Sequence, residues 1–275
     1  MALADIIDHY DRSAASFHRW WLPVIEPAAL HLLDLIDPLV VARPAAVIVD
    51  VGAGTGPLGR AAVVRWPKVR VVGVDPSEGM LAMGRAAADA SLDPPARRRL
   101  TWVTGVAERL PIATGSADAV VSSFTLQYLR RRIVGLREAR RVLGPGSAIA
   151  VMTWLADDRP FRPWAELSEV LRELAIVRPP TLEPGGPFRS LPSAAALVRR
   201  AGFREVHATE GVVEYRWKRG ALIHCTLEEE ERPLIDALDG PTLARLERLW
   251  TERLARLSED DLCYRDKVAY VTGRA

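Results

Sequence analysis

The chain has 275 residues, of which 49% are hydrophobic and 26% are charged, as is ordinary for a folded globular protein. The formal net charge of +2 gives no indication of a nucleic-acid or membrane partner, and two cysteines exclude a disulfide framework. The first residues lack a signal-peptide pattern, and no run reaches the roughly 18 apolar residues of a membrane-spanning helix. We therefore expect a cytoplasmic protein with reduced thiols.

Short hydrophobic runs alternate with helical segments between residues 46 and 154. The run 46–51 has no polar face, which predicts a strand buried on both sides of a sheet. Ser77 is placed to cap the start of a helix. The predicted strands span 46–51, 69–74, 100–103, 119–123 and 148–153, and helices are predicted at 58–67, 77–90 and 133–143. This alternation predicts a parallel sheet with crossover helices.

The flanking segments have a different character. Further predicted elements are an amphipathic helix within 155–192, a helix at 193–201, a strand at 206–217, a helix after Pro241 and a strand at 267–272. We predict a single domain with a Rossmann-like α/β fold, a seven-stranded, mostly parallel sheet flanked by helices. Its predicted parts are an N-terminal helical cap (1–43), a cofactor-binding half (44–154), a lid insertion (155–192) and the remaining sheet and helices (193–275).

A glycine-rich loop follows the first predicted strand. Gly52, Gly54 and Gly56 would let the backbone approach a ligand closely, and the helix behind them offers unpaired amides. The dinucleotide fingerprint places its third glycine where this chain has Pro57, so the spacing disfavours a nicotinamide oxidoreductase. Asp75 ends the second strand and would accept the hydroxyls of a ribose in either kind of cofactor.

Five motifs in series resemble those of the class I methyltransferases. They are VDVGAGTG, GVDPSEGML, VTGVAERLPI, ADAVVSSFTLQYL and REARRVLGPGSAIAVMTW, in the family's order between residues 46 and 154. HYDRSAASF near the N-terminus is also similar to a family motif. The resemblance is strongest to the small-molecule branch that includes the ubiquinone and menaquinone C-methyltransferases. It implies an enzyme that transfers a methyl group from S-adenosylmethionine to a lipophilic or aromatic small molecule.

The resemblance also implies how the methionine and ribose parts of the cofactor are bound. Gly52, Gly54 and Gly56 would line the methionine part. Asp50 resembles the acid that holds the amino group, directly or through water, and Asp75 would take the ribose.

The adenine and sulfonium contacts follow from the same resemblance. Pro76 and Met80 would pack beside the adenine, and Ser122 would face the sulfonium. Many relatives have Asp where this chain has Val106, and that acid accepts a hydrogen bond from the adenine amino group. Its replacement leaves the backbone of Ala107 as the expected adenine partner.

The acceptor side offers few candidate residues. Methyl transfer from a sulfonium is an in-line displacement, so it depends on alignment, and the sequence contains no recognisable catalytic dyad. His18 is a candidate base, and Tyr10 a candidate cofactor contact in the N-terminal segment. Gln127 and Tyr128 follow the fourth strand, where the family often has a histidine; they would contact the cofactor or the acceptor, or serve packing. We expect no metal ion.

Several aromatic residues flank the predicted substrate opening. They would form either part of the core or an apolar pocket for a flat acceptor. These residues are Trp20, Trp21, Trp154, Phe161 and Trp164, whereas Trp66, Trp217 and Trp250 are predicted to serve packing alone.

The charged runs are predicted to be solvated, Arg97–Arg99 as a loop and Glu228–Glu231 as an exposed helix start. Arg130–Arg132 opens a helix, where the helix dipole disfavours cations. A nucleic-acid methyltransferase is disfavoured because Ser-Ser-Phe-Thr replaces the Asn/Asp-Pro-Pro-aromatic motif that binds an extruded base. A protein that binds S-adenosylmethionine without methyl transfer stays open, as does a homodimer.

Overall fold

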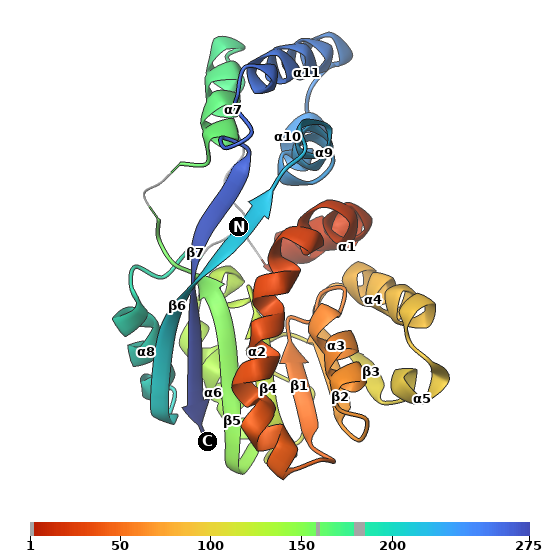
Figure 1. Ribbon diagram of the computed structural model, residues 1–275, viewed down its shortest axis with the longest axis vertical. Coiled ribbons are helices and arrows are strands. Elements are labelled where there is room, and N and C mark those ends of the chain that lie inside the picture. Colours follow the sequence, from red (N-terminus) through yellow and green to blue (C-terminus); the bar gives the residue numbers. More distant parts are fainter. Residues whose placement is uncertain (1–2, 158–159, 179–184) are drawn as a thin grey trace.

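The computed structural model describes residues 3–157, 160–178 and 185–275, and within them a seven-stranded sheet forms the centre of the molecule (Figure 1). The strand order is β3-β2-β1-β4-β5-β7-β6, and β7 runs antiparallel to both of its neighbours. The strands are β1 (Val47–Val51), β2 (Arg70–Asp75), β3 (Leu100–Thr104), β4 (Ala117–Ser123), β5 (Leu143–Trp154), β6 (Arg204–Arg216) and β7 (Cys263–Arg274). The predicted Rossmann-like, mostly parallel sheet is confirmed.

Helices cover both faces of this sheet. One face packs against α2 and α3 through buried residues such as Leu32 and Leu58, and the other packs against α6 and α8 through Leu136 and Val198. The main helices are α1 (Leu3–Ser16), α2 (Leu22–Ala42), α3 (Pro57–Arg65), α4 (Glu78–Ser91), α6 (Arg132–Val142) and α8 (Leu191–Arg200). Short elements are the π-helix η1 (Phe17–Trp21), α5 (Pro94–Arg97) and the 3-10 turn η2 (Leu126–Tyr128).

The last strand extends further than the sequence predicts. β7 begins at Cys263 rather than at Lys267, because its first residues pair with the end of β6 beyond the point where β5 ends. Trp154 of β5 pairs with Val268, so the earlier residues of β7 have β6 as their partner strand. The result is a two-stranded arm that projects past the edge of the sheet (Figure 1).

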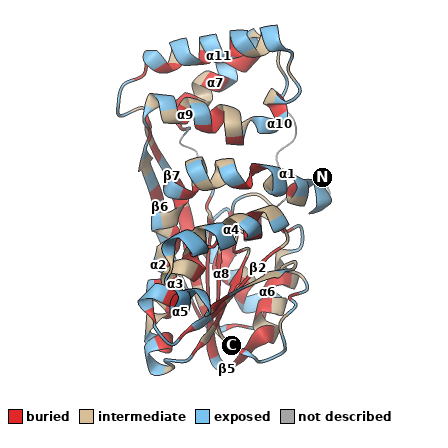
Figure 2. Ribbon diagram, turned by 90° about the vertical axis from the view of Figure 1, so that its right-hand side faces the viewer, coloured by how far each residue is buried: buried red, intermediate tan, exposed pale blue. Residues whose placement is uncertain are grey.

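A second helical layer packs at the far end of this arm, and we call it the distal cap (Figures 1 and 2). It consists of α7 (Arg162–Glu173), α9 (Arg219–Cys225), the π-helix η3 (Thr226–Glu230), α10 (Arg232–Ile235) and α11 (Gly240–Ala255). Trp250 is 0% exposed at its centre, and Leu167 and Leu171 of α7 are buried with it. The predicted lid insertion therefore supplies one helix of a larger cap, because the apolar faces of α7 and α11 pack on each other.

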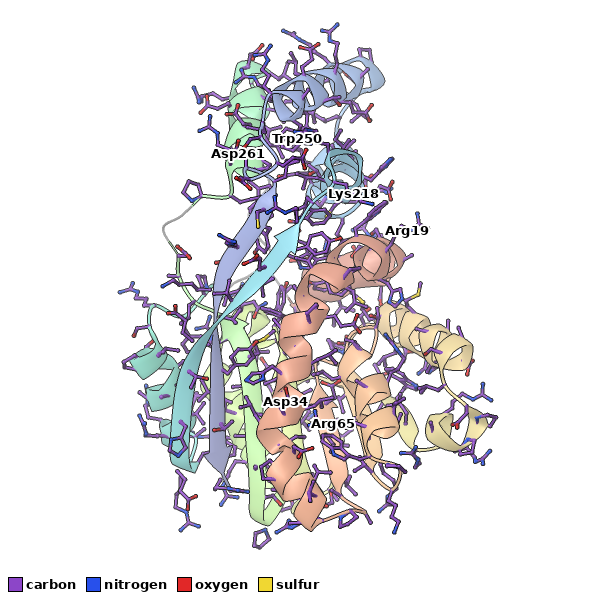
Figure 3. All side chains as sticks on the ribbon, in the orientation of Figure 1. Arg19, Asp34, Arg65, Lys218, Trp250 and Asp261 are labelled. Atoms are coloured by element: carbon purple, nitrogen blue, oxygen red, sulfur yellow. The ribbon has the colours of Figure 1, made fainter. Side chains whose placement is uncertain are left out.

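Arginine side chains tie several elements together. Arg65 of α3 forms ion pairs with Asp34 (2.5 Å) and Asp37 (2.9 Å) of α2, as the side chains in Figure 3 illustrate. Arg99 donates hydrogen bonds to the carbonyls of Val63 and Trp66 at the end of α3, which corrects the prediction of a solvated loop for this residue.

Among the residues described, no helix is long and apolar enough to cross a membrane.

Candidate functional site

A cavity of about 840 Å³ lies between the carboxyl ends of the parallel strands and the distal cap. Its walls come from the loops after β1, β2, β3 and β4, from α1 and η1, and from the distal cap. Ligands of open α/β sheets bind at this edge, outside the strand ends. The volume is at the upper end of the range of about 300–1,000 Å³ for small-molecule sites.

The three glycines after β1 have three different surroundings. All have positive φ angles, +72° at Gly52, +54° at Gly54 and +72° at Gly56. A β-carbon on Gly56 would lie 2.0 Å from the ring of Trp102, so this glycine serves helix–sheet packing. A β-carbon on Gly54 would meet no atom within 4 Å, and its backbone faces the cavity. Gly52 and Gly54 line the cavity, whereas Gly56 is not among the lining residues.

Asp75 connects the glycine loop to the start of α4. Its two carboxylate oxygens accept hydrogen bonds from the amides of Gly54 (2.8 Å) and Ser77 (2.9 Å), and the side chain lines the cavity. Burial raises the pKa of Asp75 to about 6, although those two amides act to lower it. Ser77 caps α4 as predicted, because its hydroxyl accepts the amide of Met80 (3.0 Å).

Asp50 lies behind the loop and is 2% exposed. Its Oδ1 atom has no hydrogen-bond partner, and burial together with the nearby Asp75 carboxylate raises the pKa of Asp50 to about 7. Thr55 Oγ1 and Gln127 Oε1 are also buried without partners, and both residues line the cavity. Buried polar atoms of this kind require an explanation, and a polar ligand in the cavity supplies one.

The N-terminal helix α1 closes one side of the cavity. Asp11 accepts hydrogen bonds from the hydroxyl of Ser77 (2.7 Å) and the amide of Gly79 (2.8 Å), which holds α1 at the start of α4. Tyr10 and Tyr128 both line the cavity, and their hydroxyl oxygens are 2.5 Å apart. The contact between Tyr10 of α1 and Tyr128 of η2 thus joins two walls of the cavity.

The other predicted site residues divide into two groups. Pro76, Met80, Val106, Ala107 and Gln127 line the cavity. His18 is half-buried on η1, burial and Arg60 lower its pKa, and it is not among the lining residues. Ser122 donates its hydrogen bond to the carbonyl of Val51 (2.7 Å), and its neighbour Ser123 lines the cavity instead.

Aromatic side chains form the wall nearest the distal cap. The lining residues here are Trp21, Phe124, Trp154, Trp164 and Tyr264. The rings of Phe124 and Trp154 are 4.2 Å apart, and Phe124 has a φ of +51°, a strained conformation typical of functional sites. The ring of Tyr264 packs edge-on against Trp21 and Trp164. Sequence reasoning missed Phe124 and Tyr264, because only the tertiary fold brings them beside the predicted tryptophans.

The two remaining aromatic candidates point elsewhere. Phe161 packs against Trp164 and Tyr264 from behind and is not a lining residue. Trp20 stacks on His224 and donates a hydrogen bond to Glu228 (2.7 Å). Trp66, Trp217 and Trp250 are buried, as predicted for packing residues.

Comparisons with known proteins identify the family of this chain. The family model described as a methyltransferase domain matches residues 48–146. The ubiquinone/menaquinone biosynthesis C-methyltransferase UbiE of Paracoccus denitrificans is 30% identical over 206 residues, which cover 71% of this chain and 77% of that protein. Demethylmenaquinone methyltransferase of Beutenbergia cavernae is 38% identical over 126 residues, 45% of each chain. The crystal structure of YcgJ from Bacillus subtilis has a TM-score of 0.57 at 18% identity, covering 89% of this chain and 97% of that one, which is a likeness of fold alone.

The chain belongs to the S-adenosylmethionine-dependent methyltransferases, the family of the Paracoccus relative. S-adenosylmethionine is its cofactor, and the cavity fits this molecule. The backbone of Gly54, the carboxylate of Asp75 and the unpartnered buried atoms of Thr55 and Gln127 belong to lining residues and would offer polar contacts to a ribose and an amino acid moiety. The bound cofactor supplies an electrophilic methyl group on a sulfonium, which leaves as a neutral thioether.

Alanine substitutions at Gly54 and Gly56 are expected to have different consequences for stability and for cofactor binding. Gly56→Ala should lower the free energy of unfolding by about 2–4 kcal/mol, because the methyl group adds a clash with Trp102 to the cost of the left-handed backbone. Gly54→Ala should cost about 1–2 kcal/mol, the backbone term alone, but weaken S-adenosylhomocysteine binding at least tenfold. Urea unfolding and calorimetry measure the two effects. Equal loss of stability in both variants would contradict the assignment of Gly56 to packing.

Proposed function

We propose that the enzyme methylates a flat hydroxy-aromatic small molecule, at the hydroxyl oxygen or at a ring carbon conjugated with it. The observation that carries this proposal is the aromatic wall of Phe124, Trp154, Trp164, Trp21 and Tyr264, which offers ring faces and edges to a planar ligand. Trp164 and Tyr264 of this wall come from the distal cap and the β6–β7 arm, and Phe124 comes from the loop after β4. A planar acceptor held against this wall would face the cofactor's methyl group.

The names of the relatives support an aromatic acceptor. One relative is named for ubiquinone and menaquinone biosynthesis and another for demethylmenaquinone. Quinones and their reduced forms are flat ring systems that carry oxygen atoms, so an aromatic wall would suit them as well as simpler phenols. The chain spans about half the length of the second of these relatives. The proposed acceptor class therefore depends on the aromatic wall of the cavity as well as on the names of the relatives.

The proposed cofactor contacts follow the predicted pattern with two changes. Asp75 would bind the ribose hydroxyls, Gly52 and Gly54 the methionine part, and Ala107 the adenine through its backbone. The first change replaces Ser122 with Ser123 near the sulfonium, because Ser122 bonds to Val51 within the sheet. The second adds Thr55, whose unpartnered hydroxyl lies in the lining. The proposed contacts on the remaining walls are Tyr10, Pro76, Met80, Val106 and Gln127. Asp50 is not a lining residue, and we propose that it acts on the amino group from behind the glycine loop.

A labelled methyl group tests the acceptor class. The purified enzyme, incubated with S-adenosylmethionine carrying a labelled methyl group, should label naphthols or hydroquinones and leave aliphatic amines of similar size unlabelled. Trp154→Leu should raise KM for the aromatic acceptor about tenfold, because an aromatic pair contributes roughly 0.5–1.5 kcal/mol beyond its buried area. Affinity for S-adenosylhomocysteine should stay unchanged in this variant. Labelling of amines but not of hydroxy-aromatic compounds would overturn the proposal.

Other aspects of the protein's biology stay predictions. We propose a small-molecule acceptor rather than a nucleic acid, which is supported by the cavity walls that α1 and the distal cap contribute. The single-domain organisation, the cytoplasmic location and the homodimer are likewise predictions. Size-exclusion chromatography with light scattering would decide the oligomeric state.

A further inference from the structure

Glu229 is a buried carboxyl group in the wall of the cavity. It lies on η3 of the distal cap, is 5% exposed and belongs to the lining residues. The hydroxyl of Ser16, at the end of α1, donates a hydrogen bond to its Oε2 atom (2.5 Å). This placement corrects the prediction of an exposed helix start at Glu228–Glu231, because η3 packs against α1 and η1 instead of facing solvent. π-helices of a single turn occur frequently at functional sites.

The surroundings of Glu229 contain no cation that pairs with it among the described residues. Its neighbours on η3 and α10 have their own partners, Glu228 with Trp20 and His224, and Glu231 with Arg178. The titratable and charged side chains on the elements packed against η3 are Asp5, Asp8, His9, Tyr10, Asp11 and Arg12 on α1, His18 and Arg19 on η1, Arg219, His224 and Cys225 on α9, Glu231 just before α10 and Arg232 on it, and Glu228 and Glu230 on η3 itself. Burial is the largest influence on the carboxyl and raises the pKa of Glu229 to about 7, while Ser16 and Ser13 act to lower it.

A carboxyl group in this situation is suited to take a proton at neutral pH. General bases work best when their pKa is near the working pH, and burial is the usual way in which a glutamate reaches that range. We infer that the Glu229 carboxylate is the general base that removes the hydroxyl proton of the aromatic acceptor. The inference rests on the proposed hydroxy-aromatic acceptor and adds a residue that sequence reasoning assigned to the solvated surface.

The acceptor, Glu229 and the cofactor account for every proton and electron pair in the step. The acceptor's O–H bond breaks, its proton passes to the Glu229 carboxylate, and the bonding electrons stay on the acceptor oxygen. An electron pair of that oxygen forms the bond to the methyl carbon, while the electrons of the methyl–sulfur bond go to sulfur. For attack by a conjugated ring carbon, that carbon loses its proton as the oxygen regains one. Anionic acceptor and cationic sulfonium thereby become two neutral products, and Glu229 returns its proton to solvent.

Glu229→Gln tests this role with two acceptors that differ in acidity. Naphthol is protonated at neutral pH, whereas dinitronaphthol is already ionised and needs no base. The variant should lose about 100-fold or more in kcat/KM with naphthol, the usual size of a general-base contribution. With dinitronaphthol it should stay within about threefold of the wild type. The matched control is Glu228→Gln on the same π-helix, which removes a charge that bonds to Trp20 and His224 and should leave both reactions near the wild-type rate.

Two further measurements separate a base from a structural residue. At saturating S-adenosylmethionine, the wild-type kcat/KM with naphthol should rise with pH through about 7, and this limb should be absent in Glu229→Gln. Infrared difference spectra of wild type minus variant, without cofactor, should show a carboxylic acid band that titrates near the same pH. Equal losses with both naphthols, or no titrating band, would overturn the role of Glu229 while leaving the acceptor class intact. A wild-type enzyme that methylates neither naphthol would refute the acceptor class, and the role of Glu229 would fall with it.

Discussion

Asp75→Ala is expected to weaken S-adenosylhomocysteine binding by about 100-fold or more. Two ribose hydroxyls would lose a charged acceptor, and hydrogen bonds to charged groups are each worth roughly 1.5–3 kcal/mol. The same substitution removes the acceptor of the Gly54 and Ser77 amides, so the glycine loop also loses its anchor to α4. Loop disorder would then add to the loss of direct contacts.

Calorimetry with S-adenosylhomocysteine measures this effect, and Asp118→Ala is the matched control. Asp118 also accepts a backbone amide, that of Val47 (2.9 Å), and pairs with Arg43 (2.9 Å), but it begins β4 instead of following a strand at the cavity. Its removal should cost stability and leave the affinity for cofactor unchanged. An Asp75→Ala protein that keeps its wild-type affinity would show that the ribose lies elsewhere. Nicotinamide adenine dinucleotide should bind to none of these proteins.

The sheet could be predicted from the sequence because its strands are locally encoded. β1 and β2 are short runs of β-branched residues ended by glycine or aspartate, and Ser77 marks the start of α4 by its own hydrogen bond. The glycine loop and Asp75 were found for the same reason, since the residues that form this part of the site lie within thirty positions of one another.

The acceptor side could be predicted only for Trp21, Trp154 and Trp164, because the rest of it is assembled from distant segments. Tyr264 reaches Trp21 and Trp164 only through the β6–β7 arm, whose tip depends on the pairing of Arg216 with Cys263, 47 positions later in the chain. Glu229 belongs to a run of four glutamates that has the composition of a solvated surface, and burial against Ser16 follows from the docking of α1. Trp102 explains Gly56 only once β3 is placed beside the loop.

Replacement of Asp50 is expected to raise the stability of the enzyme without cofactor and to weaken cofactor binding. The Asp50 carboxyl has a pKa of about 7 in the folded protein and 3.8 as its ordinary value, so the folded state holds the proton more tightly. Stability from this group is therefore fully present below about pH 4 and is lost as pH rises toward 7. The shift corresponds to about 4 kcal/mol by linkage. Above pH 7 the folded protein without cofactor contains a buried, ionised Asp50.

Asp50→Asn removes that charge at nearly constant volume. Above pH 7 the variant without cofactor should be about 2 kcal/mol more stable than the wild type. Removal of the buried charge stabilises the folded state, and burial of an amide without a hydrogen-bond partner offsets part of that gain. Its stability should also fall less between pH 4 and 7, as measured by urea unfolding across that range. A variant less stable than the wild type at pH 8 would mean that the ionised Asp50 has a cationic partner in the folded state.

The same variant should bind S-adenosylhomocysteine at least tenfold more weakly, because the amino group of the ligand needs an anionic partner close to the glycine loop. Wild-type affinity should fall as pH drops through about 7, where Asp50 takes up its proton, and fall again near 6, where Asp75 does. Asp50→Asn should lose the first of these steps and keep the second. The buried Asp50 charge that destabilises the enzyme without cofactor would then be the charge that the cofactor's ammonium group neutralises. Cofactor binding would therefore stabilise the fold by giving Asp50 Oδ1 the partner that it lacks.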